Sequence, residues 1–173
     1  MHARSMNVIG SIGLALSLSA CGGSDSAASD GAMNADGSTT GPHDPSLDDG
    51  SVQALCVNTI NMYRATLGLP AYARWSDAES CTDGEAESDS MSGKAHGAFG
   101  ACKEHAQDEC PGWPAPPETM IGNCLAQMWA EGPGADFSAH GHYLNMSSTQ
   151  YTMASCGFHT TGANSVWAVQ NFK

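Results

Sequence analysis

Residues 141–157 read Gly-His-Tyr-Leu-Asn-Met-Ser-Ser-Thr-Gln-Tyr-Thr-Met-Ala-Ser-Cys-Gly, and this stretch carries most of the information about the fold. It places His142 ahead of residues 151–158, whose side chains alternate between polar and apolar as in a β-strand. Residues 165–172 alternate in the same way, after a short connection that contains Gly162. The stretch therefore predicts a C-terminal β-hairpin with a histidine just before it.

Helical patterns precede the hairpin. Apolar side chains recur with a 3.6-residue period in residues 52–67 and again in residues 120–129, and a further helical stretch starts near Ser76. Between them, residues 93–118 contain four prolines and four glycines and are predicted to form a long irregular loop. Helices combined with an antiparallel hairpin predict an α+β fold, with about three helices flanking a small antiparallel sheet.

Acidic residues dominate the charge of the chain. There are 18 Asp and Glu against 6 Lys and Arg, which gives a net charge of −12. Such a charge repels phosphate backbones, so we expect no nucleic-acid partner. Six of the acidic residues fall in the second helical stretch, where a solvated helix face is expected: Asp77, Glu79, Asp83, Glu85, Glu87 and Asp89.

Seven cysteines are many for 173 residues, and disulfides persist in oxidising compartments. Six of them fall in the predicted domain, where six cysteines allow about 15 pairings. Proximity along the chain and the expected packing of the elements favour three pairs. These predicted disulfides are Cys56–Cys81, Cys102–Cys110 and Cys124–Cys156.

The N-terminus indicates export. Residues 1–20 resemble a signal peptide, because residues 8–18 are apolar but too short for a span, which needs about 20 residues. Leu18-Ser19-Ala20-Cys21 resembles a bacterial lipobox, so Cys21 is predicted to be lipidated and to anchor the protein in the membrane. Gly22 after the cysteine favours the outer membrane. An ordinary secretory signal, leaving Cys21 free, is the alternative.

Three segments follow from these patterns. Residues 1–20 are the predicted lipoprotein signal peptide, and residues 21–50 a disordered Gly/Ser/Asp-rich tether with little to bury. Residues 51–173 suit one compact domain.

The order of residues in this domain resembles the CAP superfamily, which comprises cysteine-rich secretory proteins, antigen 5 and pathogenesis-related proteins. The resemblance covers about residues 52–173. Its most specific part is Gly141-His142 through Gly157. Its first part is carried by Asn61, Arg64, Gly68-Leu69-Pro70 and Trp75.

The resemblance implies an α-β-α sandwich whose cleft holds two histidines and two glutamates. On this chain they fall on His96, Glu109, Glu131 and His142. The family usually has Gly-Glu-Asn around its first glutamate, whereas this chain has Asp108-Glu109-Cys110, so Glu104 is an alternative to Glu109. His140 is likewise an alternative to His142.

Imidazole nitrogens and carboxylate oxygens suit a divalent cation such as zinc. We expect His96 and His142 as metal ligands, supported by Glu109 and Glu131; the same four residues are also the candidates for acid–base catalysis. The leading hypothesis is a binding module of the cell envelope with a lipid, glycan or protein ligand. The alternatives are a hydrolase of protease or esterase type, for which no GxSxG or HExxH motif is present, and a passive structural lipoprotein. The oligomeric state is left open.

Overall fold

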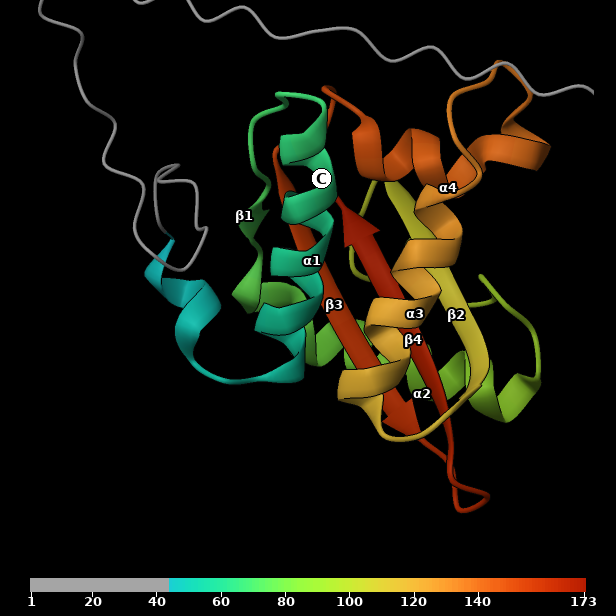
Figure 1. Ribbon diagram of the computed structural model, residues 1–173. Coiled ribbons are helices and arrows are strands. Elements are labelled where there is room, and N and C mark those ends of the chain that lie inside the picture. Colours follow the sequence, from blue (N-terminus) through green and yellow to red (C-terminus); the bar gives the residue numbers. More distant parts are fainter. Residues whose placement is uncertain (1–43) are drawn as a thin grey trace, which may run out of the picture. The chain divides into compact units, whose positions relative to one another are not determined.

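The computed structural model describes residues 44–173 (Figure 1). The predicted signal peptide, Cys21 and most of the predicted tether lie outside the described residues. The elements, in chain order, are the 3₁₀ helix η1 (Pro45–Asp48), α1 (Val52–Thr66), β1 (Ala73–Arg74), the 3₁₀ helix η2 (Ser76–Ala78), α2 (Glu79–Ser92), β2 (Ala106–Pro114), α3 (Pro117–Trp129), α4 (Phe137–Ser147), β3 (Met153–Thr160) and β4 (Ser165–Phe172).

Four strands form one mixed sheet in the order β1-β3-β4-β2. The predicted hairpin is confirmed as β3 and β4, and β2 pairs antiparallel with the other side of β4. The short strand β1 runs parallel to β3. In Figure 1, α1 and α3 lie in front of the sheet and α2 lies behind it. The domain is therefore the α+β, three-layer sandwich expected from the sequence.

The alternation of strand side chains assigns each residue to one of the two faces. On β2, Cys110 is joined to α3 and Asp108 bonds α4, whereas Gln107 bonds Glu85 of α2. The main apolar core lies on the α1–α3 face, and its buried side chains include Val57, Ile60, Ile121, Leu125, Val166 and Phe172. The α2 face of β2 is instead polar, since Gln107 and Glu109 lie on it.

The predicted helices are confirmed, with one addition. Ser51 caps α1, since its Oγ accepts a hydrogen bond from the backbone N–H of Ala54 at 3.1 Å. The addition is α4, whose N-cap Asp136 accepts from the backbone N–H of Ser138. No helix within residues 44–173 is long and apolar enough to cross a bilayer.

The loop predicted for residues 93–118 contains the strand β2, so that prediction is wrong over residues 106–114. The alternation of polar and apolar residues that marks a strand is missing from β2, because polar side chains on both of its faces bond to neighbouring elements. Gln107 donates to Glu85 and Asn171 on one face, and Asp108 accepts from Asn145 on the other.

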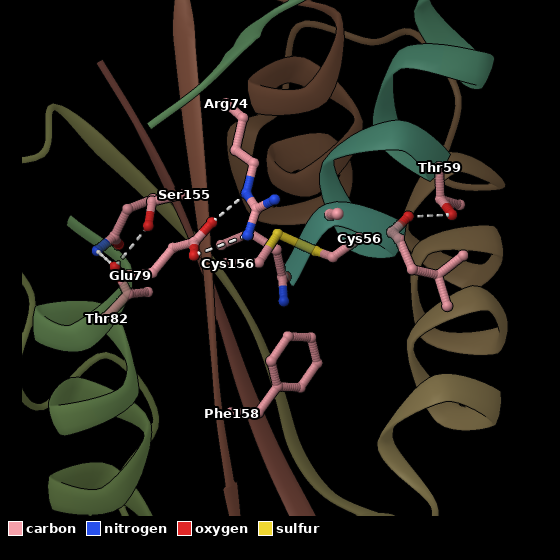
Figure 2. The surroundings of a disulfide bond; sticks show 12 residues. Cys56, Thr59, Arg74, Glu79, Thr82, Ser155, Cys156 and Phe158 are labelled. Carbon is pink, nitrogen blue, oxygen red and sulfur yellow. Dashed lines mark hydrogen bonds and ion pairs between the residues drawn. A yellow bond between two sulfur atoms is a disulfide. The ribbon is translucent and has the colours of Figure 1, made fainter. Parts of the chain in front are cut away.

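All three predicted disulfide pairings are wrong. The structure joins Cys56 to Cys156, Cys81 to Cys102, and Cys110 to Cys124. Figure 2 shows the first of these, which ties α1 to β3 across the core. Proximity in sequence misled the prediction, because the first bridge spans 100 residues and Cys102 pairs back with α2 and not with the nearby Cys110. Three disulfides in one small domain are typical of an exported protein.

The folded part of the chain begins before residue 51. Arg74 donates to Glu79 (Figure 2) and to Asp49, and its Nη1 also bonds the carbonyl oxygen of Ser46. Leu47 of η1 packs against the core. The last residues of the predicted tether are thus part of the domain.

The acidic run of the second helix is not entirely solvated. Asp77 and Glu87 are exposed, as expected, but Glu85 and Asp89 are buried, one helical turn apart. Both face the sheet beside β2, where Gln107 bonds Glu85. The prediction of a solvated face is therefore wrong for these two residues.

Candidate functional site

Two adjoining hollows lie along α4. One has a volume of about 360 Å³ and the other of about 410 Å³, and they share the side chains of Phe137, Asn145 and Tyr151. The first extends to His96, Phe99, His105, Ala106 and Gln107, and the second to Leu144, Ser147, Ser148, Thr149 and Gln150. We call the two together the α4 groove. It brings the segment before β2 together with α4 although about 40 residues separate them.

His96 is held over the α2 face of β2. Its backbone N–H donates to Oε2 of Glu109 at 2.6 Å, and its ring Nδ1 lies 3.9 Å from the same oxygen. His96 has a positive φ of 58°, a backbone conformation that costs energy for a non-glycine residue and is often seen at binding sites. Burial raises the pKa of Glu109, the hydrogen bond from His96 opposes the rise, and the charge of Asp89 adds to it.

Gln107 determines which nitrogen of the neutral His96 ring carries the proton. Its Nε2 donates to Asn171 at 3.1 Å and to Glu85 at 3.3 Å, so its Oε1 must face the imidazole. That oxygen can only accept, and it lies 2.9 Å from Nδ1 of His96. The neutral ring therefore carries its proton on Nδ1, which leaves the lone pair of Nε2 available.

Glu131 and His142 form the second pair. Nδ1 of His142 lies 2.5 Å from Oε1 of Glu131, whose other oxygen accepts the backbone N–H groups of His142 and Tyr143. Glu131 follows the end of α3, so this carboxylate joins α3 to α4. The contact again engages Nδ1 and leaves Nε2 of the neutral imidazole available.

The four predicted site residues thus form two His–Glu pairs. Glu109 lies on the α2 face of the sheet, whereas Glu131 and His142 belong to the helices of the other face. Among residues 44–173, the group of three metal-ligating side chains whose donor atoms all lie within 4.8 Å of one another is Glu85, Cys102 and Glu104. The four candidates are not in that group, and a cation shared by His96 and His142 stays a prediction.

The alternatives from the sequence have other partners. Glu104 is buried beside Glu85, and its Oε1 accepts the backbone N–H of Gly100. His140 places Nδ1 at 2.8 Å from the carbonyl oxygen of Glu131 and at 3.0 Å from that of Gly132. His140 therefore closes the end of α3, and Glu104 ties down the segment before β2.

Asp108 and Asn145 are site residues that the sequence analysis missed. Nδ2 of Asn145 donates to Asp108 at 2.8 Å, which orients the amide at the wall of the α4 groove. Burial raises the pKa of Asp108 well above its ordinary value, and the charge of Glu131 adds to the rise. Recognising residues 106–114 as a strand would have indicated that Asp108 points away from Glu109 and towards α4.

The serines near the groove show no sign of activation as nucleophiles. Ser148 accepts the backbone N–H of Gln150, and Ser138 donates to Asp136. In the described part of the chain, no serine hydroxyl hydrogen-bonds a histidine ring, the arrangement that a serine nucleophile needs.

Known proteins resemble this chain in structure but not in sequence. No family model matches the sequence, and no curated protein matches it. Among solved structures, Na-ASP-1, a protein of the CAP/SCP/PR-1 family, matches with a TM-score of 0.52 and 10% sequence identity. The match covers 70% of this chain but 38% of Na-ASP-1. At this identity the match establishes the fold alone, and the fold of residues 44–173 is CAP-like.

Proposed function

We propose that the protein is an exported binding module of CAP type that holds its ligand in the α4 groove. The observation that carries the proposal is the pair of imidazoles, His96 and His142, each with Nδ1 engaged by an oxygen. His96 lines the groove, and Asn145, one helical turn from His142, lines it as well.

We propose a divalent cation of the zinc type as the ligand of the two imidazoles. Histidines that bind metals generally donate Nδ1–H to an oxygen, which orients the ring and makes Nε2 a better ligand. Gln107 supports His96 in this way, and Glu131 supports His142. Two imidazoles would leave positions open for water or a ligand. In this proposal the chain's own carboxylates orient the rings and do not bind the cation directly.

Zinc titration by calorimetry tests this part of the proposal. We expect His96→Ala and His142→Ala each to weaken zinc binding by about tenfold or more, since each removes one of two nitrogen ligands. His159→Ala is the matched control, because this histidine lies on β3 away from the groove and should leave the affinity unchanged. Equal affinity in all four proteins would rule out a site at His96 and His142.

The groove itself suits an amphipathic small molecule such as a lipid. Phe99 and Phe137 line it and are 52% and 64% exposed, a poor arrangement unless a ligand covers the rings. The amides of Gln107 and Asn145 lie beside them and can hold a polar head. A lipid whose tail covers the two phenylalanine rings and whose head group bonds the two amides would match both the apolar and the polar part of the groove.

Binding of a fluorescent fatty acid tests the groove. We expect Phe137→Ala to weaken binding by about fivefold, because it removes apolar area that the ligand covers. The matched control is Met91→Ala on α2, which removes an apolar side chain that is 80% exposed and lies outside the groove. If fatty acid does not bind while a glycan or peptide does, the ligand class proposed here is wrong.

Anchoring through Cys21 is a separate part of the proposal. Acyl chains on this residue would hold the domain at the membrane, and two or more chains give stable attachment. We expect Cys21→Ser to move the protein from the membrane fraction to the soluble exported fraction in a bacterial host, with loss of the lipid mass. An unchanged membrane fraction would exclude this anchor.

The hydrolase alternative requires a water activated by a metal or by a His–Glu pair acting as general base, because the serines near the groove are not activated. Turnover of peptide or ester substrates that requires both His96 and His142 would favour this alternative. It would replace the binding proposal without changing the metal assignment.

A further inference from the structure

Two carboxyl groups meet between α2 and β2 without hydrogen-bond donors for most of their oxygens. Asp89 is 0% exposed and Glu109 is 4% exposed. Neither oxygen of Asp89 accepts a hydrogen bond from an N–H or hydroxyl group, and Oε1 of Glu109 accepts none either, so that the two carboxyl groups face each other within hydrogen-bond reach. The charge of Asp89 acts on Glu109 at close range. When both groups are ionised, three buried carboxylate oxygens are left without a donor or a positive charge, which is costly in a protein interior.

The surroundings supply too little positive charge to balance them. Within residues 44–173 the ion pairs include no lysine or arginine at Asp89 or Glu109. The ring of His96 lies 3.9 Å from Glu109 and is partly exposed. One imidazole, neutral when its Nε2 lone pair is free, does not offset two buried carboxylates.

The segment after α2 closes over this pair through its backbone. The N–H of Lys94 donates to the carbonyl oxygen of Asp89, and the N–H of His96 donates to Glu109. At Gly97, an added Cβ would lie 2.9 Å from Oδ1 of Asp89 and 3.1 Å from the carbonyl oxygen of Lys94. Oδ1 of Asp89 and the carbonyl oxygen of Lys94 therefore both lie next to the Cβ position of Gly97, under the segment that carries His96.

We propose that Asp89 and Glu109 bind a calcium ion, with the carbonyl oxygen of Lys94 as a further donor. Carboxylate and carbonyl oxygens are the ligands that calcium takes, whereas zinc favours nitrogen and sulfur. The ion tethers residues 94–97 to α2 and β2 and so fixes the position of His96 at the groove. This site does not depend on zinc or on a ligand in the groove.

Calcium titration of the purified, oxidised protein after removal of metals with EDTA tests the proposal. We expect one calcium ion per chain by elemental analysis and a rise in melting temperature of about 5 °C at millimolar calcium. Asp89→Asn should abolish the calcium-dependent rise. Glu87→Gln, an exposed carboxylate on the same helix, should keep it, and His142→Ala should keep it as well, which separates this site from the proposed zinc site.

Absence of bound calcium in the wild-type protein, together with an unchanged melting temperature, would overturn the proposal. In that case a proton shared between Asp89 and Glu109 neutralises the pair instead. A full calcium effect in Asp89→Asn would also overturn it. The wild-type stoichiometry decides the matter even if this variant fails to fold.

Discussion

Arg64 shows how one buried side chain can hold three segments in place. It is 2% exposed and donates Nε–H to the carbonyl oxygen of Pro70, and Nη1 to the carbonyl oxygens of Met146 and Ser148. Its guanidinium lies 3.6 Å from the centroid of the Tyr72 ring, in a cation–π contact. The end of α4, and with it the wall of the α4 groove, is therefore fixed to α1.

Glu85 gives the protein a pH-dependent stability. Its burial raises its pKa from 4.5 to about 7, and the nearby charge of Glu104 adds to the rise. The folded state then keeps a proton that the unfolded chain releases, so the free energy of unfolding falls as pH rises from about 4.5 to 7. We expect a loss on the order of 2 kcal/mol.

Urea denaturation in EDTA between pH 4.5 and pH 8 measures this loss, with the chelator excluding any effect of calcium. Glu85→Gln should reduce the slope, because the amide does not titrate, and should leave the part due to Asp108 and Glu109, whose pKa values burial also raises. Glu87→Gln should keep the wild-type slope, since Glu87 is exposed. Parallel slopes for the wild type and Glu85→Gln would show that another group is responsible.

At the level of elements, Gly157 allows α2 to lie directly on the sheet. A Cβ on this β3 residue would come within 2.2 Å of the carbonyl carbon of Thr82 and 2.3 Å of the backbone nitrogen of Asp83. The backbone N–H of Phe158 donates to Asp83 at 2.7 Å in the same contact. The close approach is therefore one of backbone on backbone, which no side-chain rearrangement can relieve.

Gly157→Ala should therefore lower the free energy of unfolding by about 3 kcal/mol, because α2 must move off the sheet. Gly84→Ala on α2 is the matched control. No atom lies within 4 Å of its added Cβ, and alanine should raise helix stability by about 0.5–1 kcal/mol. Thermal or urea unfolding of both variants gives the comparison, and equal effects would contradict the packing described here.

Elements with a clear period could be predicted from the sequence, whereas β2 and the cysteine pairing could not. The helix α1 and the hairpin β3–β4 each bury one apolar face, which produces a period that the sequence displays. In β2 the buried side chains Gln107, Asp108 and Glu109 are polar. Gln107 and Asp108 bond partners far along the chain, and Glu109 accepts the backbone N–H of His96. A buried polar strand has no sequence signature of its own.

The candidate site was partly predictable for the same reason. The sequence indicated His96, Glu109, Glu131 and His142, and the structure pairs them as His96–Glu109 and Glu131–His142. Gln107, which orients His96, and Asn145, which lines the groove, carry no signal without the fold. Asp89 was hidden in an acidic run that looks solvated until one face of α2 is known to touch the sheet.

For the whole molecule, the disulfides should stabilise in order of the loop that each closes. Cys56–Cys156 closes a sequence separation of 100 residues and Cys110–Cys124 one of 14. Loop-closure entropy predicts that replacing both cysteines by alanine costs about 4.7 kcal/mol for the first bridge and about 3 kcal/mol for the second. Urea denaturation of the two double variants measures the difference, and the reverse order would show that native packing outweighs loop closure. Peptide mapping without reduction verifies the pairs.

The position of β4 has a consequence for biogenesis. This strand is the last element of the domain to be synthesised, yet it lies between β3 and β2. Until it emerges from the ribosome or the export channel, β2 has no strand beside it, and half of the sheet cannot assemble. The sheet can therefore close only once this C-terminal strand is available, after all six cysteines of the domain have been synthesised.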